Sequence, residues 1–180
     1  YVSSSAIASL DLIRGIDTDW GVALDVGYFD ALINEDSEDP IAYYQRGLAL
    51  LSLGEFESAN LDIEKSYSLG LTLDEVRAVR GYTRFKIGLI SEAGRGLLGA
   101  AADAPQDALV RTYVGDYQLL LGFHAGALND LQVASALDPD LELAKLVRAK
   151  VFASLGMKDS LNEALESLSD SKLPTAHDYV

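Results

Sequence analysis

The chain has 180 residues, of which 49% are apolar, 28 are acidic and 14 are basic, and it contains no cysteine. Its formal charge of -14 repels phosphate backbones and anionic headgroups, which disfavours nucleic acid as a partner. No apolar run approaches the roughly 18 to 20 residues that cross a bilayer, and the lack of cysteine excludes disulfides, thiolate metal ligands and cysteine nucleophiles. We therefore expect a soluble, folded chain without direct membrane insertion, in a compartment that the sequence does not assign.

The first predicted elements are a divergent pair of helices within residues 1–38, with a break near Gly15 to Asp19. Two later dipeptides, Asp39-Pro40 and Asp138-Pro139, predict helix starts. An Asp side chain accepts hydrogen bonds from the free amides of a first helical turn, and Pro loses no hydrogen bond at the first position.

From Asp39 onward, small and large residues recur every 34 positions. The recurring glycines are Gly47, Gly81 and Gly115 in one column, continued by Ala149, and Gly54, Gly88, Gly122 and Gly156 in a second column. The first column lies seven residues before the second, on a helix face where a missing side chain lets a neighbouring helix approach closely. The second column follows an apolar-periodic run, which predicts a left-handed residue that ends a helix. A period of this length predicts a stack of helix pairs.

This period divides the chain into clear repeats at 39–72, 73–106 and 107–140, a degenerate capping repeat at 141–170, and a tail at 171–180. In the capping repeat, Leu161 and Leu168 replace residues that are small in earlier copies. Because repeat arrays grow by adding units, we expect one continuous domain over residues 1–180.

The recurring residues resemble the signature of the tetratricopeptide repeat (TPR) family. In the first clear copy they are Tyr43, Gly47, Leu50, Gly54, Ala59, Ile63, Ser66 and Leu71. The resemblance covers residues 40–140 and implies an all-α, right-handed α-solenoid of antiparallel helix pairs with about four to five repeats. It also implies a non-catalytic module, part of a larger protein or complex, that binds a peptide or protein segment in its concave groove. The alternative is a structural scaffold that self-associates into a homo-oligomer.

The resemblance further implies that the first helix of each repeat lines the groove. The expected groove residues are Tyr44, Gln45, Leu48, Val79, Tyr82, Lys86, Tyr113, Asp116, Leu120, Val147 and Lys150. Tyrosine suits peptide recognition because it combines rigid area with a polar tip. The alternative reading is that these tyrosines cover helix junctions. The basic residues with which some family members hold a partner's terminal carboxylate are missing from the matching positions.

Six of the eight arginines fall in the first helices of repeats, although the chain is acidic. They are Arg46, Arg77, Arg80, Arg84, Arg111 and Arg148. They form either a basic seam that clamps carboxylates of a partner through forked hydrogen bonds, or internal pairs with acidic residues of adjacent helices.

Only one motif suggests a cofactor. Gly94, Gly96 and Gly99 match the spacing of a dinucleotide-binding fingerprint. That fingerprint requires a preceding strand and a tight turn, whereas here it falls inside the second helix of a repeat, where close helix packing explains the glycines better. The two histidines, His124 and His177, lie at a repeat turn and in the tail, so neither a metal cluster nor a Ser/His/Asp arrangement has an evident basis. We therefore expect no catalytic residue, no cofactor and no metal.

Overall fold

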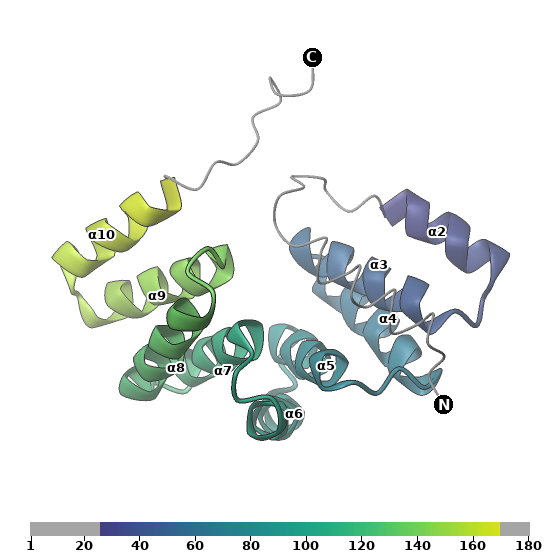
Figure 1. Cartoon of the computed structure of the whole chain (residues 1–180), viewed down its shortest axis with the longest axis horizontal. Coiled ribbons are helices and arrows are strands. Elements are labelled where there is room, and N and C mark those ends of the chain that lie inside the picture. The colour runs from purple at the N-terminus through teal and green to yellow at the C-terminus, as the bar shows by residue number, and fades with distance from the viewer. Residues whose placement is uncertain (1–25, 170–180) are drawn as a thin grey trace, which may run out of the picture. The chain divides into compact units, whose positions relative to one another are not determined.

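In a computed structural model that describes residues 26–169, the chain folds into α-helices joined by short turns (Figure 1). The nine helices of the described residues are α2 (Val26–Glu35), α3 (Pro40–Ser52), α4 (Phe56–Ser68), α5 (Asp74–Lys86), α6 (Ile90–Asp103), α7 (Ala108–Leu120), α8 (His124–Leu137), α9 (Glu142–Leu155) and α10 (Lys158–Ser169). From α3 onward they form sequential antiparallel pairs, which confirms the predicted all-α fold of paired helices. The first part of the expected N-terminal pair and the tail lie outside the described residues. Between residues 26 and 169 no helix is both long and apolar enough to cross a membrane.

The helices belong to two compact units. Unit 1 comprises Tyr1–Val76 and contains α2, α3 and α4; unit 2 comprises Arg77–Val180 and contains α5 from Arg77 onward and the helices that follow. Within unit 2, α5, α7 and α9 are the first helices of their pairs. Figure 1 shows these three following one another, with α6 below α5 and α7. The prediction of one continuous domain stays a prediction.

One of the two predicted helix starts is correct. The Asp39 side chain accepts hydrogen bonds from the amides of Ile41 (2.8 Å) and Ala42 (3.3 Å), and Pro40 is the first residue of α3. The start expected at Asp138-Pro139 is wrong, because α9 begins later, at Glu142. The Asp138 carboxylate instead accepts a hydrogen bond from the amide of Asp140 (3.0 Å), which closes a turn ahead of the helix.

The second glycine column ends the first helix of each pair, as predicted. Gly54, Gly88, Gly122 and Gly156 all have positive φ, between 68° and 86°. In the α7–α8 turn, the Gly122 amide donates to the Leu119 carbonyl (3.0 Å) and the Phe123 amide to the Gln118 carbonyl (2.9 Å). This pair of bonds satisfies carbonyls left free at the helix end, and the other three turns repeat it.

The first glycine column provides the predicted packing notches. A Cβ on Gly47 would lie 2.8 Å from Cδ1 of Ile63, and one on Gly115 would lie 3.0 Å from Cγ of Leu131. Ile63 and Leu131 are both fully buried. Each glycine therefore lets the second helix of its pair insert a large side chain against the backbone of the first.

Candidate partner-binding surface

Two stacked tyrosines join α5 to α7. The rings of Tyr82 and Tyr113 are nearly parallel, at 12°, with centroids 4.0 Å apart. Both are almost fully buried, at 4% and 3% exposure. Aromatic pairs of this kind stabilise a junction beyond the area that they bury.

Asp116 of α7 lies beside this stack and interacts with side chains of α5 and α9, the two neighbouring first helices. The Tyr82 hydroxyl donates a hydrogen bond of 3.0 Å to Oδ2 of Asp116. Lys86 Nζ on α5 and Lys150 Nζ on α9 each lie 3.9 Å from a different oxygen of the same carboxylate. A buried carboxylate is costly unless it is paired and hydrogen-bonded, and these three groups compensate it.

The position of Lys86 is also set by aromatic rings. Its ammonium lies 5.5 Å from the centroid of Tyr82 and 5.7 Å from that of Phe85. Such cation–π contacts attract the charge electrostatically. The stack, the carboxylate and the two lysines therefore form one cluster across α5, α7 and α9.

The hydroxyl of Tyr82 is held in its protonated form. Burial, and secondarily the negative charge of Asp116, raises the pKa of Tyr82 far above its usual value. A neutral hydroxyl that cannot readily ionise remains a hydrogen-bond donor to Asp116 at any physiological pH.

The expected groove residues occupy three levels of exposure. Tyr44, Val79, Tyr82, Tyr113, Asp116 and Val147 are buried; Gln45, Leu48 and Lys86 are half-buried; Leu120 and Lys150 are exposed. Tyr82 and Tyr113 thus cover a helix junction, the alternative that the sequence left open. In unit 2 the accessible part of the surface comes from Lys86, Leu120 and Lys150.

Arg46 of α3 is paired inside unit 1. Its Nε and Nη2 donate to the two carboxylate oxygens of Asp62 on α4, each at 2.7 Å, and its Nη1 donates to Asp30 on α2 at 2.7 Å. The forked bond to Asp62 raises the pKa of Arg46 above its usual value. Such a fork is the strongest geometry for this pair.

Two arginines of unit 2 are also paired internally. Arg111 donates to Asp130 (2.8 Å) and to the Pro105 carbonyl (3.0 Å), and Arg77 pairs with Asp103 at 2.9 Å. Internal pairing is therefore the role of three of the six arginines. For Arg80, Arg84 and Arg148, which are half-buried, a role in binding a partner stays a prediction.

Sequence reasoning missed the buried carboxylates that hold these arginines. Asp62 and Asp130 are buried and lie two periods of 34 residues apart, so they occupy the same position in their repeats. That recurrence was the available signal. The recurrence does not identify their partners, because Asp62 pairs with Arg46 and Asp130 pairs with Arg111, and these two arginines occupy different positions in their repeats.

The three glycines of the apparent dinucleotide fingerprint lie inside α6, as expected. A Cβ on Gly96 would lie 3.3 Å from Cα of Gly81, and one on Gly94 would lie 2.9 Å from Cζ of Tyr117. Both glycines therefore admit close packing by α5 and α7. Among residues 26–169, no three His, Asp or Glu side chains group as a metal site requires.

Paired helices with glycine notches, left-handed turn glycines and a cluster across successive first helices define a helical-repeat fold of the TPR type. The sequence matches no family model and no curated protein. Its fold is that of solved TPR proteins. TTC0263, a thermophilic TPR protein from Thermus thermophilus, superposes with a TM-score of 0.64 at 21% identity, with 72% of each chain covered.

Two further structures have the same fold. A tetratricopeptide repeat protein from Parabacteroides merdae ATCC 43184 gives a TM-score of 0.68 at 17% identity, covering 86% of this chain and 59% of that one. YrrB, described as a TPR protein with an unusual peptide-binding site, gives 0.52 at 19% identity, covering 86% and 82%. At these identities the similarity establishes the fold.

Proposed function

We propose that this protein is a non-catalytic interaction module that binds a segment of another protein on the face formed by α5, α7 and α9. The observation that carries the proposal is the cluster around Asp116. It unites side chains from three successive first helices and holds two ammonium groups at its border. TPR proteins are typically protein- or peptide-binding modules, and YrrB is described by its peptide-binding site.

The chemistry of this face favours a partner segment that carries both a carboxylate and an apolar side chain. Lys150 is exposed and Lys86 is half-buried, while Leu120 presents an exposed apolar side chain on the intervening helix. A carboxylate between the two lysines would gain two charge-assisted hydrogen bonds. The buried Tyr82–Tyr113 stack fixes α5 against α7, which lowers the entropic cost of binding.

Affinity capture with matched variants tests the proposal. The immobilised full chain is exposed to a lysate of its own source, and captured proteins are identified by mass spectrometry. The variants are Lys86→Gln with Lys150→Gln, and as a control Lys65→Gln with Lys158→Gln, which removes the same charge from exposed sites on α4 and α10.

We expect the first pair to weaken the captured partner's binding about tenfold or more, with little change in the control pair. Circular dichroism checks that both remain folded. Equal binding by the wild type and the Lys86/Lys150 variant would show that this face is not the binding surface.

A further inference from the structure

The last helix in the described part of the chain, α10, exposes apolar side chains at positions that are buried in the pairs before it. It lies beside α9 (Figure 1). Leu165 of α10 is 49% exposed, whereas its equivalents one and two repeat periods earlier, Leu131 and Leu97, are fully buried. Leu161 and Leu168 lie one turn before and one turn after Leu165, on the same side of α10, and are half-buried. We call these three leucines of α10 the end face.

In the preceding pair, the equivalent face is covered by the first helix that follows it. One buried cluster joins Ala127, Leu131 and Ala134 of α8 to Ala144, Val147 and Val151 of α9. The three residues of α8 are one repeat period before the three leucines of the end face. The three residues of α9 are spaced i, i+3 and i+7, so they form one apolar stripe on their helix. The preceding pair therefore shows what kind of element covers such a face, namely a helix with an apolar stripe in the place of α9.

The composition of the end face also indicates that it is covered. A terminal pair of a repeat array that faces water needs a polar outer face. Leu161 and Leu168 instead replace two alanines of α8, so the end face has more apolar area than its counterpart. Residues 170–180 do not repeat the stripe of α9, because the position of Ala144 is taken by the charged residue Asp178. They are therefore a poor match for the covering helix.

The acidic residues of α10 lie outside the end face. The exposed charged residues of α10 are Lys158, Asp159, Glu163 and Glu166. In α8 the positions of the three acids are taken by Ala125, Asn129 and Gln132, which are exposed although α9 covers α8. A helix in the equivalent place on α10 would thus leave the three carboxylates in solvent and contact the leucines.

A series of polar contacts specifies the covering helix further. Across successive first helices, the Tyr82 hydroxyl donates to Asp116, and Asp116 attracts Lys150 one repeat period later. Lys150 is the last member of this series in the described residues, and its side chain is 44% exposed. A first helix in the next position would place its own member of the series beside Lys150, where a carboxylate is favourable. In α9 this position lies three residues after Val147, which is i+6 of the apolar stripe.

We propose that the end face binds a helix of a partner protein, docked as α9 docks on α8. The partner helix carries Ala or Val at i, i+3 and i+7, because the two added leucines leave little room for larger side chains, and Asp or Glu at i+6 beside Lys150. Because this chain has a net charge of -14, the rest of the partner helix is neutral or basic. The end face is a second binding surface, which shares only Lys150 with the face of α5, α7 and α9.

A peptide copied from α9 tests the end face. The probe is a fluorescently labelled peptide with the sequence of residues 138–155 and the substitution Lys150→Glu, and its anisotropy is measured as the full chain is added. We expect saturable binding with a dissociation constant of about 10 to 100 µM. Leu165→Asp in the chain should weaken it at least about tenfold. The matched control is Leu98→Asp, which changes a leucine of α6 that is 53% exposed and outside the end face, and it should bind like the wild type.

A second peptide tests the charge at i+6. The same peptide with its original Lys150 should bind at least about threefold more weakly, because its ammonium would lie beside that of Lys150 in the chain. Circular dichroism checks that the Leu165→Asp chain is folded, and Leu165→Ser repeats the comparison with a smaller change.

Three results would overturn the proposal. They are no saturable binding of the Glu peptide up to about 500 µM, undiminished binding by folded Leu165 variants, and equal binding of the two peptides. Because Leu165 lies outside the face of α5, α7 and α9, none of these results would bear on the function proposed for that face.

Discussion

The ring of Tyr117 on α7 lies directly over Gly94 on α6, where any larger residue would place its Cβ. That Cβ would come within 2.9 Å of Cζ of Tyr117 and closer still to the hydroxyl. The ring cannot swing away freely, because it packs edge-on against Phe85 with centroids 6.0 Å apart. A residue that matches a cofactor motif in sequence is therefore a packing site between two helices.

Gly94→Ala should consequently destabilise the protein by about 1 to 2 kcal/mol, because the cost of overpacking exceeds the gain in helix propensity. Gly99→Ala is the control on the same helix. Its new Cβ would have Nη2 of Arg77 as its nearest atom, at an ordinary contact distance of 3.6 Å. It should be neutral or stabilising by up to about 1 kcal/mol. Urea denaturation measures both, and a stabilising Gly94→Ala would contradict the packing role.

The two carboxylates that hold Arg46 should differ in their contribution to stability. Asp62 is buried and accepts the forked bond, whereas Asp30 is half exposed. We expect Asp62→Asn to cost about 2 kcal/mol, because it leaves a partly buried guanidinium with a weakened partner. Asp30→Asn should cost at most about 1 kcal/mol. Equal costs in denaturant unfolding would show that the fork to Asp62 has no special role.

Tyr82 should make the protein sensitive to alkaline pH. Because burial raises the pKa of Tyr82 in the folded state, the unfolded chain loses this proton first, near the free tyrosine value of about 10. Stability from Tyr82 is therefore fully present below about pH 10 and is lost as pH rises above it. Tyr82→Phe lacks this ionisation, so the stability difference between wild type and variant should shrink above about pH 10. A difference that stays constant to about pH 11 in urea titrations would contradict this assignment.

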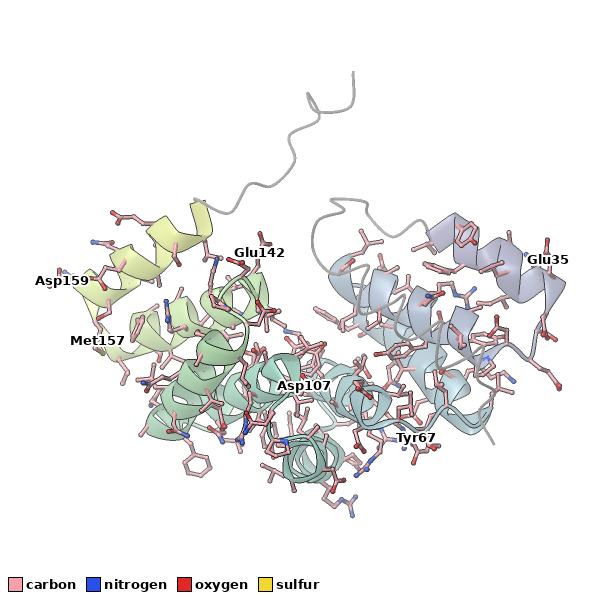
Figure 2. The ribbon with its side chains drawn as sticks, viewed as in Figure 1. Glu35, Tyr67, Asp107, Glu142, Met157 and Asp159 are labelled. Carbon is pink, nitrogen blue, oxygen red and sulfur yellow. The ribbon has the colours of Figure 1, made fainter. Side chains whose placement is uncertain are left out.

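Asp107 and Asp138 should contribute differently to the stability of the fold. The Asp107 carboxylate caps α7 by accepting a hydrogen bond of 2.9 Å from the Val110 amide, and Figure 2 labels it at the start of that helix. Asp107→Ala should cost about 1 kcal/mol. Asp138→Ala should cost less than about 0.5 kcal/mol, because Asp138 caps no helix start and its bond to Asp140 is exposed. Thermal unfolding of the two variants gives the comparison.

The repeat period made much of the fold predictable. Two kinds of glycine recur at the repeat period. Gly115 makes room for the large side chain of Leu131, and Gly122 ends a helix with positive φ. The start of α9 was mispredicted because Asp-Pro also begins turns, and only the hydrogen bond from Asp140 to Asp138 distinguishes the two cases.

The candidate surface was less predictable, because its side chains interact across repeats. Tyr82 and Asp116 are 34 positions apart in equivalent helices, and the resemblance placed both in the groove. Both are buried, and their direct hydrogen bond depends on the distance between α5 and α7. Periodicity assigns a residue to a helix face, but the depth of a side chain on that face follows from how its neighbours pack.

The most direct test of the account is hydrogen–deuterium exchange of the full chain with and without its captured partner, at a concentration where the chain itself is monomeric. Binding on the face of α5, α7 and α9 predicts slower exchange in peptides from Arg77–Lys86, Ala108–Leu120 and Glu142–Leu155, with little change in α6 and α8. Protection confined to α6 and α8, or to unit 1, would contradict it.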